Sequence, residues 1–287
     1  MTSSNFSSYN PKRISYILPT KDRAECIRKI LPLILDMVTP EDELLIIDGG
    51  STDNTAEVIH SFNNRVDIFI SEPDIGQSHA LNKGILLARG KYIKICNDDD
   101  MVYREGIEKM YEMLELHPEV DVLVGGGMWR PQNAHAKWRA FYVPPGTNYG
   151  SKPEDVFLYG GCSAGFLIRR SVFAKIGFFS SYFYIVDFEF LIRCIAKGIN
   201  VKFCRVNSYS ATVYEWSVTV RKKHEENIEK IMLARQYCST LFFLGFYFKK
   251  SPLTRNIFMR IRRCSRMLFG ARQNRKEVHE VWDGGFS

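Results

Sequence analysis

Short, fully apolar runs alternate with segments of helical periodicity over the first 125 residues of the chain. The apolar runs predict strands at 13–18, 43–48, 66–71, 92–96 and 120–124. The segments between them predict helices at 24–38, near Thr55, at 78–88 and at 105–117. Strands without polar alternation are typical of a sheet that is covered on both faces. The sequence therefore predicts an α/β fold with a mostly parallel central sheet and helices on both faces.

The alternation ends at Gly125, and the segment 128–152 is rich in aromatic residues and prolines. Such a long and partly irregular segment often builds a binding site. Beyond it, the pattern predicts a strand within 158–169, helices at 171–176 and 187–197, and strands at 201–206 and 209–213. From Arg221 onward the chain is predicted to be largely helical.

Polar side chains follow three of the predicted strands, at 19–22, at Asp48 and at 97–100. Ligands of open parallel sheets bind outside the carboxyl ends of the strands. Because all three strand ends are expected on the same edge of the sheet, we expect a ligand site there. The glycine patterns of dinucleotide-binding and P-loop sites are missing from the sequence.

The third of these strand ends carries three consecutive carboxylates, Asp98, Asp99 and Asp100. Neighbouring carboxylates repel one another unless a cation lies among them. Mg²⁺ and Mn²⁺ prefer oxygen ligands and commonly bridge carboxylates to substrate phosphates. The sequence therefore predicts a nucleotide that is held by side chains and by Mn²⁺ or Mg²⁺.

The formal charge of +7 arises in one segment of the chain. Residues 249–276 contain ten basic residues and no acidic one, so the rest of the chain is slightly acidic. Apolar residues recur there at helical spacing, at Leu253, Ile257, Ile261, Cys264 and Leu268. A basic amphipathic helix is typical of binding to an anionic membrane surface, and nucleic-acid binding is the rival interpretation. A helix that packs on the body of the protein is the alternative.

The seven cysteines are scattered and odd in number, which predicts reduced thiols and a cytoplasmic protein. Residues 1–11 have no apolar segment of the kind found in signal peptides. The longest uncharged apolar stretch, 237–248, is too short to span a bilayer, which takes about 20 residues. It could insert shallowly beside the basic segment.

Successive sequence blocks carry a family resemblance. They are Pro19-Thr20, 46–55 (IIDGGSTDNT), 71–77 (SEPDIGQ), 80–84 (ALNKG), 90–92 (GKY) and 97–100 (NDDD). In this order and spacing they resemble family 2 glycosyltransferases with the GT-A fold. The resemblance implies a GT-A domain over 13–220, with a nucleotide-binding half at 13–127 and an acceptor half at 128–220. Residues 1–12 are then a disordered N-terminus, and 221–287 a helical, basic C-terminal extension.

The resemblance assigns donor-binding roles to matching residues. Asp48 matches the acid that binds the base of a sugar nucleotide, and Pro19, Thr20 and Asp22 match contacts to the nucleoside. Lys83 lies in a block near the nucleotide, with an exposed helix lysine as an equal alternative.

The same resemblance assigns roles within the aspartate cluster. Asp98 and Asp100 match the ends of the DxD motif, with Asp98 near the ribose and the metal and Asp100 on the metal. Asp99 is expected to support the turn beside the nucleotide.

The general base is expected in the block 184–193 (YIVDFEFLIR), where Asp187 matches the family's acidic residue and Glu189 is a second candidate. A base near the acceptor hydroxyl and one displacement at the anomeric carbon imply inversion. The alternative for Asp187 is a helix cap. The acceptor could contact a set of aromatic and small residues, namely Trp129, Trp138, Phe141, Tyr142, Tyr149 and 160–162 (GGC). His79 lies beside a site block, where a contact with the substrate is one interpretation and a histidine that starts a helix is the favoured one.

Together these expectations describe a metal-dependent inverting glycosyltransferase that uses a nucleotide-sugar donor, with a UDP-sugar favoured. The acceptor is expected to be a glycan or a lipid-linked glycan in cell-surface polysaccharide synthesis. The protein is expected on the inner face of the cell membrane. The alternatives are a nucleotidyltransferase with the same metal site, and a non-catalytic scaffold that binds sugar nucleotides or membranes.

Overall fold

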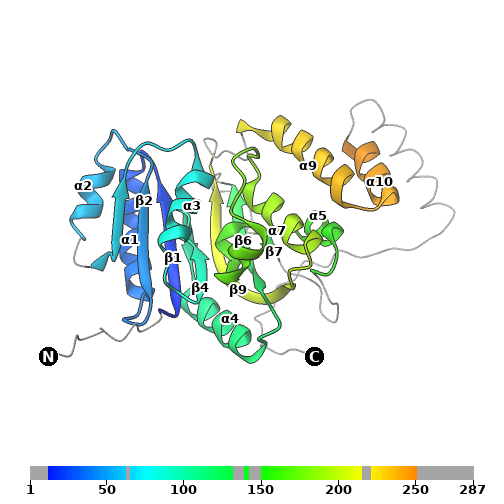
Figure 1. The fold of residues 1–287 in the computed structure, drawn as a ribbon. Coiled ribbons are helices and arrows are strands. Elements are labelled where there is room, and N and C mark those ends of the chain that lie inside the picture. The colour runs from blue at the N-terminus through cyan, green and yellow to red at the C-terminus, as the bar shows by residue number, and fades with distance from the viewer. Residues whose placement is uncertain (1–11, 63–64, 132–138, 142–149, 215–220, 251–287) are drawn as a thin grey trace, which may run out of the picture.

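The computed structural model describes residues 12–62, 65–131, 139–141, 150–214 and 221–250. Within these residues, one nine-stranded sheet forms the centre of the molecule (Figure 1). Its strands follow the order β3-β2-β1-β4-β8-β6-β9-β5, and β7 pairs with β6. The predicted α/β class with a central sheet is therefore confirmed.

The first four strands are parallel and lie close to their predicted positions. They are β1 (Ile14–Thr20), β2 (Glu43–Asp48), β3 (Ile68–Ser71) and β4 (Tyr92–Ile95). The helices that follow the first three are α1 (Ala24–Met37), α2 (Thr55–His60) and α3 (Gln77–Leu87). In the register, Thr20 lies beside Asp48 and Asp48 lies beside Ser71. The predicted edge of polar strand ends is therefore real.

The parallel run stops at β4. Strand β8 (Phe166–Arg169) pairs antiparallel with both β4 and β6 (Val122–Pro131), so the fifth predicted strand does not lie beside β4. The apolar run at 120–124 predicts a buried strand but carries no signal for its neighbour, which comes from about 40 residues later in the chain.

Three other strands complete the second half of the sheet. The two strands expected at 201–206 and 209–213 are one strand, β9 (Val201–Val213), parallel to β6. The short strand β5 (Asp100–Val102) begins within the aspartate cluster and pairs antiparallel with β9. Strand β7 spans Arg139–Phe141.

Helices cover both faces of the sheet, as predicted. Tyr16 and Leu18 of β1 pack with α1, α2 and α4 (Arg104–Leu116) on one face. Ile17 packs with α3, α6 (Ser171–Ile176) and α7 (Val186–Ala196) on the other. Because neighbouring residues of β1 bury their side chains on opposite faces, the strands read as continuous apolar runs.

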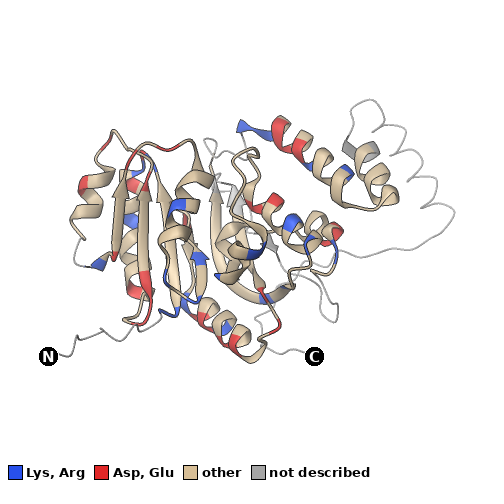
Figure 2. Ribbon diagram, viewed as in Figure 1, with Lys and Arg blue, Asp and Glu red and all other residues tan. Residues whose placement is uncertain are grey.

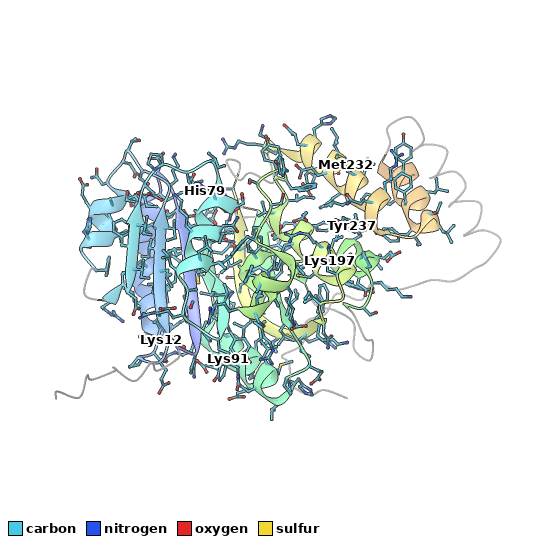
Figure 3. All side chains as sticks on the ribbon, in the orientation of Figure 1. Lys12, His79, Lys91, Lys197, Met232 and Tyr237 are labelled. Carbon is cyan, nitrogen blue, oxygen red and sulfur yellow. The ribbon has the colours of Figure 1, made fainter. Side chains whose placement is uncertain are left out.

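Figure 3 separates the two edges of the sheet. Lys12 and Lys91 lie at one edge, just before β1 and β4 begin, while His79 lies at the other, near the start of α3. The polar strand ends and the site described below belong to the second edge.

The remaining helices cover the side of the molecule away from β1 to β3 (Figure 1). They are α5 (Pro153–Tyr159), α9 (Lys223–Tyr237) and α10 (Thr240–Lys250). The 3₁₀ turn η2 (Ser163–Gly165) is instead buried beside β4, β6 and β9. Phe242 and Phe246 of α10 contact the ring of Phe157 of α5, at centroid distances of 5.5 and 5.1 Å. No helix in the described part of the chain has the length and apolar character needed to cross a bilayer. The predicted basic amphipathic segment beyond residue 250 lies outside the described residues, as do residues 1–11.

Candidate active site

The ends of β1 and β4 are joined by a hydrogen bond. The buried hydroxyl of Thr20 donates to Asp98 Oδ2 at 2.8 Å. Two residues of the predicted nucleotide site, which are 78 positions apart in the sequence, are therefore in direct contact.

Asp22 connects the loops that follow β1 and β2. Its backbone N–H donates to the hydroxyl of Ser51 at 2.7 Å, and its Oδ1 accepts the backbone N–H of Thr52 at 2.7 Å. The Thr52 N–H lowers the pKa of Asp22 below its ordinary value. Its φ of 51° lies in the left-handed region, where aspartate is tolerated better than most residues.

Asp48 is fully buried beneath this edge. Its Oδ2 accepts the hydroxyl of Ser71 at 2.6 Å and the N–H of Ser51 at 3.1 Å, and its Oδ1 accepts the hydroxyl of Ser51. It does not line the large cavity described below. This geometry supports the turn after β2, and a direct contact between Asp48 and a nucleotide stays a prediction.

Lys83 also lies outside the lining of that cavity. Its ammonium pairs with Glu72 at 2.8 Å, on the loop after β3. His79, in the first turn of α3, accepts the N–H of Ile75 at 3.4 Å and does not line the cavity either.

Asp74 is a site residue that the sequence reasoning missed. Its carboxylate lines the cavity and occupies the space beside Gly49, where an added Cβ would lie 2.5 Å from Asp74 Oδ2. The pair Gly49-Gly50 points to this residue in the sequence. The backbone of the turn requires glycine only at Gly50, with its φ of 74°, so Gly49 needs another reason. The absence of a side chain at residue 49 makes room for this carboxylate.

The three consecutive aspartates lie in an environment that resists their ionisation. Burial raises the pKa of Asp98 to about 6 and that of Asp100 to about 7, and the neighbouring carboxylates add to both shifts. Burial also raises the pKa of Asp99. Asp100 is held by Asn97, whose Nδ2 donates to Asp100 Oδ2 at 2.7 Å.

The donor atoms of this cluster fit a hard divalent cation. Carboxylate oxygens are available, and the buried Asn97 Oδ1 has no hydrogen-bond donor among the described residues. A cation would also relieve the repulsion that raises these pKa values. The described residues hold no group of three or more metal-ligating side chains, so phosphate oxygens and waters would complete the coordination.

Asp187 lies in the first turn of α7, one residue after the helix begins. Its Oδ2 accepts the N–H of Ser163 in η2 at 3.3 Å, and its Oδ1 accepts the N–H of Phe188 at 2.8 Å. Burial raises the pKa of Asp187, and the positive charge of Lys230 opposes the rise. The N-cap residue is Ile185, so Asp187 does not occupy the N-cap position, although its carboxylate does accept a first-turn N–H.

Glu189, the second candidate base, forms an ion pair with Arg193. It is buried, and its Oε1 accepts the Nε of Arg193 at 2.7 Å, one helical turn later. Its side chain does not line the cavity.

One cavity of about 1130 Å³ is lined by Thr20, by the Asp98–Asp100 cluster and by Asp187. Its lining includes residues 19–23, Asp74 and 97–100, together with 160–163 and 184–188. Among the predicted acceptor contacts, Trp129 and the segment 160–162 line it. Trp138, Tyr142 and Tyr149 lie outside the described residues, as does the side chain of Phe141.

The beginning of α9 completes the cavity with charged side chains. Arg221, Lys222, Lys223 and Lys230 line it together with Glu226. Figure 2 shows basic and then acidic residues following one another along this end of α9. Lys230 pairs with Glu226 at 2.5 Å, and its Nζ lies 4.9 Å from the centre of the Phe188 ring, next to Asp187.

The sequence model of the family "Glycosyl transferase family 2" matches residues 15–177, which is more than half of the chain. The chain belongs to this family. The matched region contains the sheet edge with Thr20, Asp98 and Asp100, whereas Asp187 lies ten residues beyond its end.

Two bacterial relatives show how far the sequence similarity extends. The chain is 32% identical over 115 residues to the glycosyltransferase GlyG of Streptococcus pneumoniae, a match over 39% of this chain and 38% of GlyG. It is 30% identical over 114 residues to a poly-beta-1,6-N-acetyl-D-glucosamine synthase of Staphylococcus epidermidis, over 39% of this chain and 28% of the synthase. The chain therefore spans well under two thirds of either relative.

Solved structures match the fold over most of the chain. The S. aureus TarS fragment 1–349 in complex with UDP-GlcNAc matches with a TM-score of 0.60 and 16% identity, over 87% of this chain and 70% of that one. The mannosyltransferase PcManGT of Pyrobaculum calidifontis, in complex with GDP-Man and Mn²⁺, matches with a TM-score of 0.54 and 17% identity, over 83% and 63%. These likenesses confirm the predicted GT-A fold.

Proposed function

We propose that this chain is a metal-dependent, inverting glycosyltransferase that moves a sugar from a nucleotide donor, with a UDP-sugar favoured, to a glycan or lipid-linked acceptor. The observation that carries the proposal is the single cavity lined both by the Asp98–Asp100 cluster and by Asp187. Family membership and the nucleotide-sugar complexes of the structural neighbours support it.

The donor is proposed to bind at the edge formed by β1, β2 and β4. Thr20 and Asp98 are already hydrogen-bonded to each other. Asp22 joins the loop that follows β1 to the loop that follows β2. Asp74 presents a carboxylate to the cavity and is proposed to accept an N–H from the base. Pro19 and Asp99 line the same wall, while Asp48 and Lys83 support it from outside the cavity.

Asp98 and Asp100 are the proposed ligands of Mn²⁺ or Mg²⁺. When bound, such an ion supplies positive charge that stabilises a departing nucleoside diphosphate. The protein's own contribution is to hold the two carboxylates at the end of β4 and the start of β5, with Thr20 and Asn97 as their hydrogen-bond donors.

Asp187, which lines the same cavity as the aspartate cluster, is the proposed general base. Its raised pKa suits a group that must take a proton from an acceptor hydroxyl, because a more basic carboxylate accepts that proton more readily. The N–H groups of Ser163 and Phe188 orient the carboxylate. A single displacement assisted in this way inverts the anomeric configuration.

Asp187 also separates this function from the two alternatives. A nucleotidyltransferase would use the metal cluster but would not need the Asp187 carboxylate in the same cavity. A scaffold that only binds sugar nucleotides or membranes would need neither a base nor its orienting N–H groups. Both remain outcomes of the experiment below.

The cellular setting is part of the same proposal. Relatives named for polysaccharide synthesis support an acceptor in a cell-surface glycan. We place the enzyme in the cytoplasm, on the inner face of the membrane, held by the basic segment 249–276. Sedimentation with anionic liposomes should fail after truncation near residue 249, and unchanged sedimentation would contradict the membrane contact.

The donor hypothesis is tested by thermal unfolding with UDP-GlcNAc, UDP-glucose, dTDP-glucose and GDP-mannose, each with and without Mn²⁺. A nucleotide that binds only the folded state at 100 times its Kd stabilises it by about 2.7 kcal/mol. We expect one nucleotide to raise the melting temperature only when Mn²⁺ is present. In a separate activity assay, the sugar nucleotide of that type should undergo sugar transfer or slow hydrolysis. Stabilisation by none of them would overturn the proposal.

A further inference from the structure

Helix α9 carries a glutamate that is bound to the backbone in front of Asp187. Glu229 is only 8% exposed. Both of its oxygens accept the N–H of Tyr184 at 3.0 Å, and Oε2 also accepts the N–H of Ile185 at 3.1 Å. Ile185 is the N-cap of α7, and Asp187 follows two residues later. A carboxylate from a distant helix therefore holds the backbone immediately before α7.

This contact replaces a local cap. The N-cap residue Ile185 makes no side-chain capping bond, and within the first turn Asp187 accepts the N–H of Phe188. The N–H groups at a helix start need partners, and a negative charge is favourable there because of the helix dipole. Glu229, 45 positions from Tyr184 in the sequence, accepts the N–H groups of Tyr184 and of the N-cap residue Ile185. Its carboxylate also places a negative charge near the helix start.

Helix α9 does not depend on Glu229 for its position. Leu233 and Ala234, one turn further along, are 1% and 0% exposed and pack into the body of the protein. Glu226 and Lys230 pair with each other on the cavity side of α9. We therefore expect a change at residue 229 to leave α9 in place and to affect mainly the start of α7.

We propose that Glu229 is a positioning residue for Asp187, a proposal that rests on the role of Asp187 as general base. By fixing the backbone at Tyr184 and Ile185, it sets the direction of the Asp187 carboxylate toward the acceptor hydroxyl. Its own carboxylate bonds only to backbone N–H groups and takes no part in proton transfer. A displacement of about 1 Å at a reacting group can lower the rate about 100-fold.

The test uses Glu229→Ala and Glu229→Gln, with Glu225→Gln as the matched control on the same helix. Glu225 pairs with Lys222 at 3.3 Å and does not line the cavity. The assay follows release of UDP or GDP from UDP-GlcNAc, UDP-glucose and GDP-mannose with Mn²⁺. We expect Glu229→Ala to lower kcat at least about tenfold and to leave KM for the donor within about twofold. The kcat of Glu229→Gln should lie between those of Glu229→Ala and the unmodified chain, because its amide oxygen still accepts one N–H.

A second measurement is independent of turnover. Because the N–H groups of Phe188 and Ser163 lower the pKa of Asp187, a shift of the α7 start in Glu229→Ala that weakens these contacts should raise that pKa. The pKa is read from the carboxyl ¹³C shift of Asp187 during a pH titration. An unchanged Asp187 pKa in Glu229→Ala, an unchanged kcat, or a fall in kcat matched by equal loss of UDP affinity would each overturn the positioning role.

The two proposals fail differently. If the unmodified chain releases no diphosphate from any donor, the proposed function fails, while the Asp187 titration still decides whether Glu229 acts on that carboxylate. If the unmodified chain is active and Glu229→Ala is equally active, only the positioning role fails.

Discussion

The buried ammonium of Lys94 donates a hydrogen bond to the backbone oxygen of Ala164. Lys94 is 1% exposed, and its Nζ also donates to the oxygen of Ile95 at 3.0 Å. Ala164 belongs to η2, whose neighbouring residue Ser163 donates its N–H to Asp187. One side chain of β4, the strand that leads into the aspartate cluster, therefore also holds the turn that orients the proposed base.

Replacing Lys94 by methionine should separate stability from activity. The carbonyls of Ile95 and Ala164 lose their donor, at a cost of about 1–3 kcal/mol for each unsatisfied group, but the cost of burying a charge also disappears. We expect a change of only a few degrees in melting temperature and a fall of about tenfold or more in kcat, because η2 and Asp187 shift. Lys91→Met is the control, since Lys91 is exposed and pairs with Glu115. Equal activity in both variants would contradict this link.

Asp187→Asn should abolish sugar transfer and leave donor binding nearly unchanged. The amide keeps the shape of the side chain but takes no proton, and general-base assistance contributes about 10²–10⁴ in rate. Transfer and UDP affinity are measured in parallel, with the exposed Asp36→Asn as the control. Retained turnover in Asp187→Asn would remove it as the base.

Most of the donor edge could be predicted from the sequence, because each part of it is local. The βα units end in polar residues at 19–22, Asp48 and 97–100, and the register places Thr20 beside Asp48. The Thr20–Asp98 contact follows from that arrangement once β1 and β4 are neighbours.

The contacts between distant segments could not be predicted in this way. Glu229 reads as one acid among several on a polar helix, and nothing in its sequence neighbourhood points to Tyr184. Lys94 reads as the single polar residue of an apolar run, and its partner Ala164 is 70 positions away. Asp48 and Lys83 match their motifs, but neither lines the cavity. Side-chain partners of this kind depend on the packing of the second half of the sheet, which a local pattern does not specify.

Lys230→Gln should move the acid limb of the pH–rate profile to higher pH. The positive charge of Lys230 holds down the pKa of Asp187, which burial raises. Without that charge the base stays protonated to a higher pH, so activity is lost earlier as the pH falls. The profile of kcat/KM is compared with that of Lys109→Gln, an exposed lysine outside the cavity. A limb that stays in place or moves to lower pH would contradict the charge effect.

Gly49→Ala should weaken nucleotide binding more than it weakens the fold. The added Cβ would lie 2.5 Å from Asp74 Oδ2, so the Asp74 carboxylate has to move. Overpacking commonly costs about 1–3 kcal/mol, and here the atom that must move ends a side chain that lines the cavity. Calorimetric titration with UDP should show a several-fold loss of affinity. Gly245→Ala, where an added Cβ meets nothing within 4 Å, should bind UDP normally.

The aspartate cluster should make metal-free stability fall as the pH rises. The folded-state pKa values of Asp98 and Asp100, about 6 and about 7, lie above their ordinary values, so the folded state binds more protons than the unfolded state between about pH 4 and pH 7. With EDTA, the melting temperature should therefore drop across that window, and it should drop less in Asp100→Asn. Mn²⁺ binds the deprotonated carboxylates, so it should raise the melting temperature more at pH 7.5 than at pH 5. An equal slope in Asp100→Asn, or an equal effect of Mn²⁺ at both pH values, would show that the cluster neither carries the protons nor holds the metal.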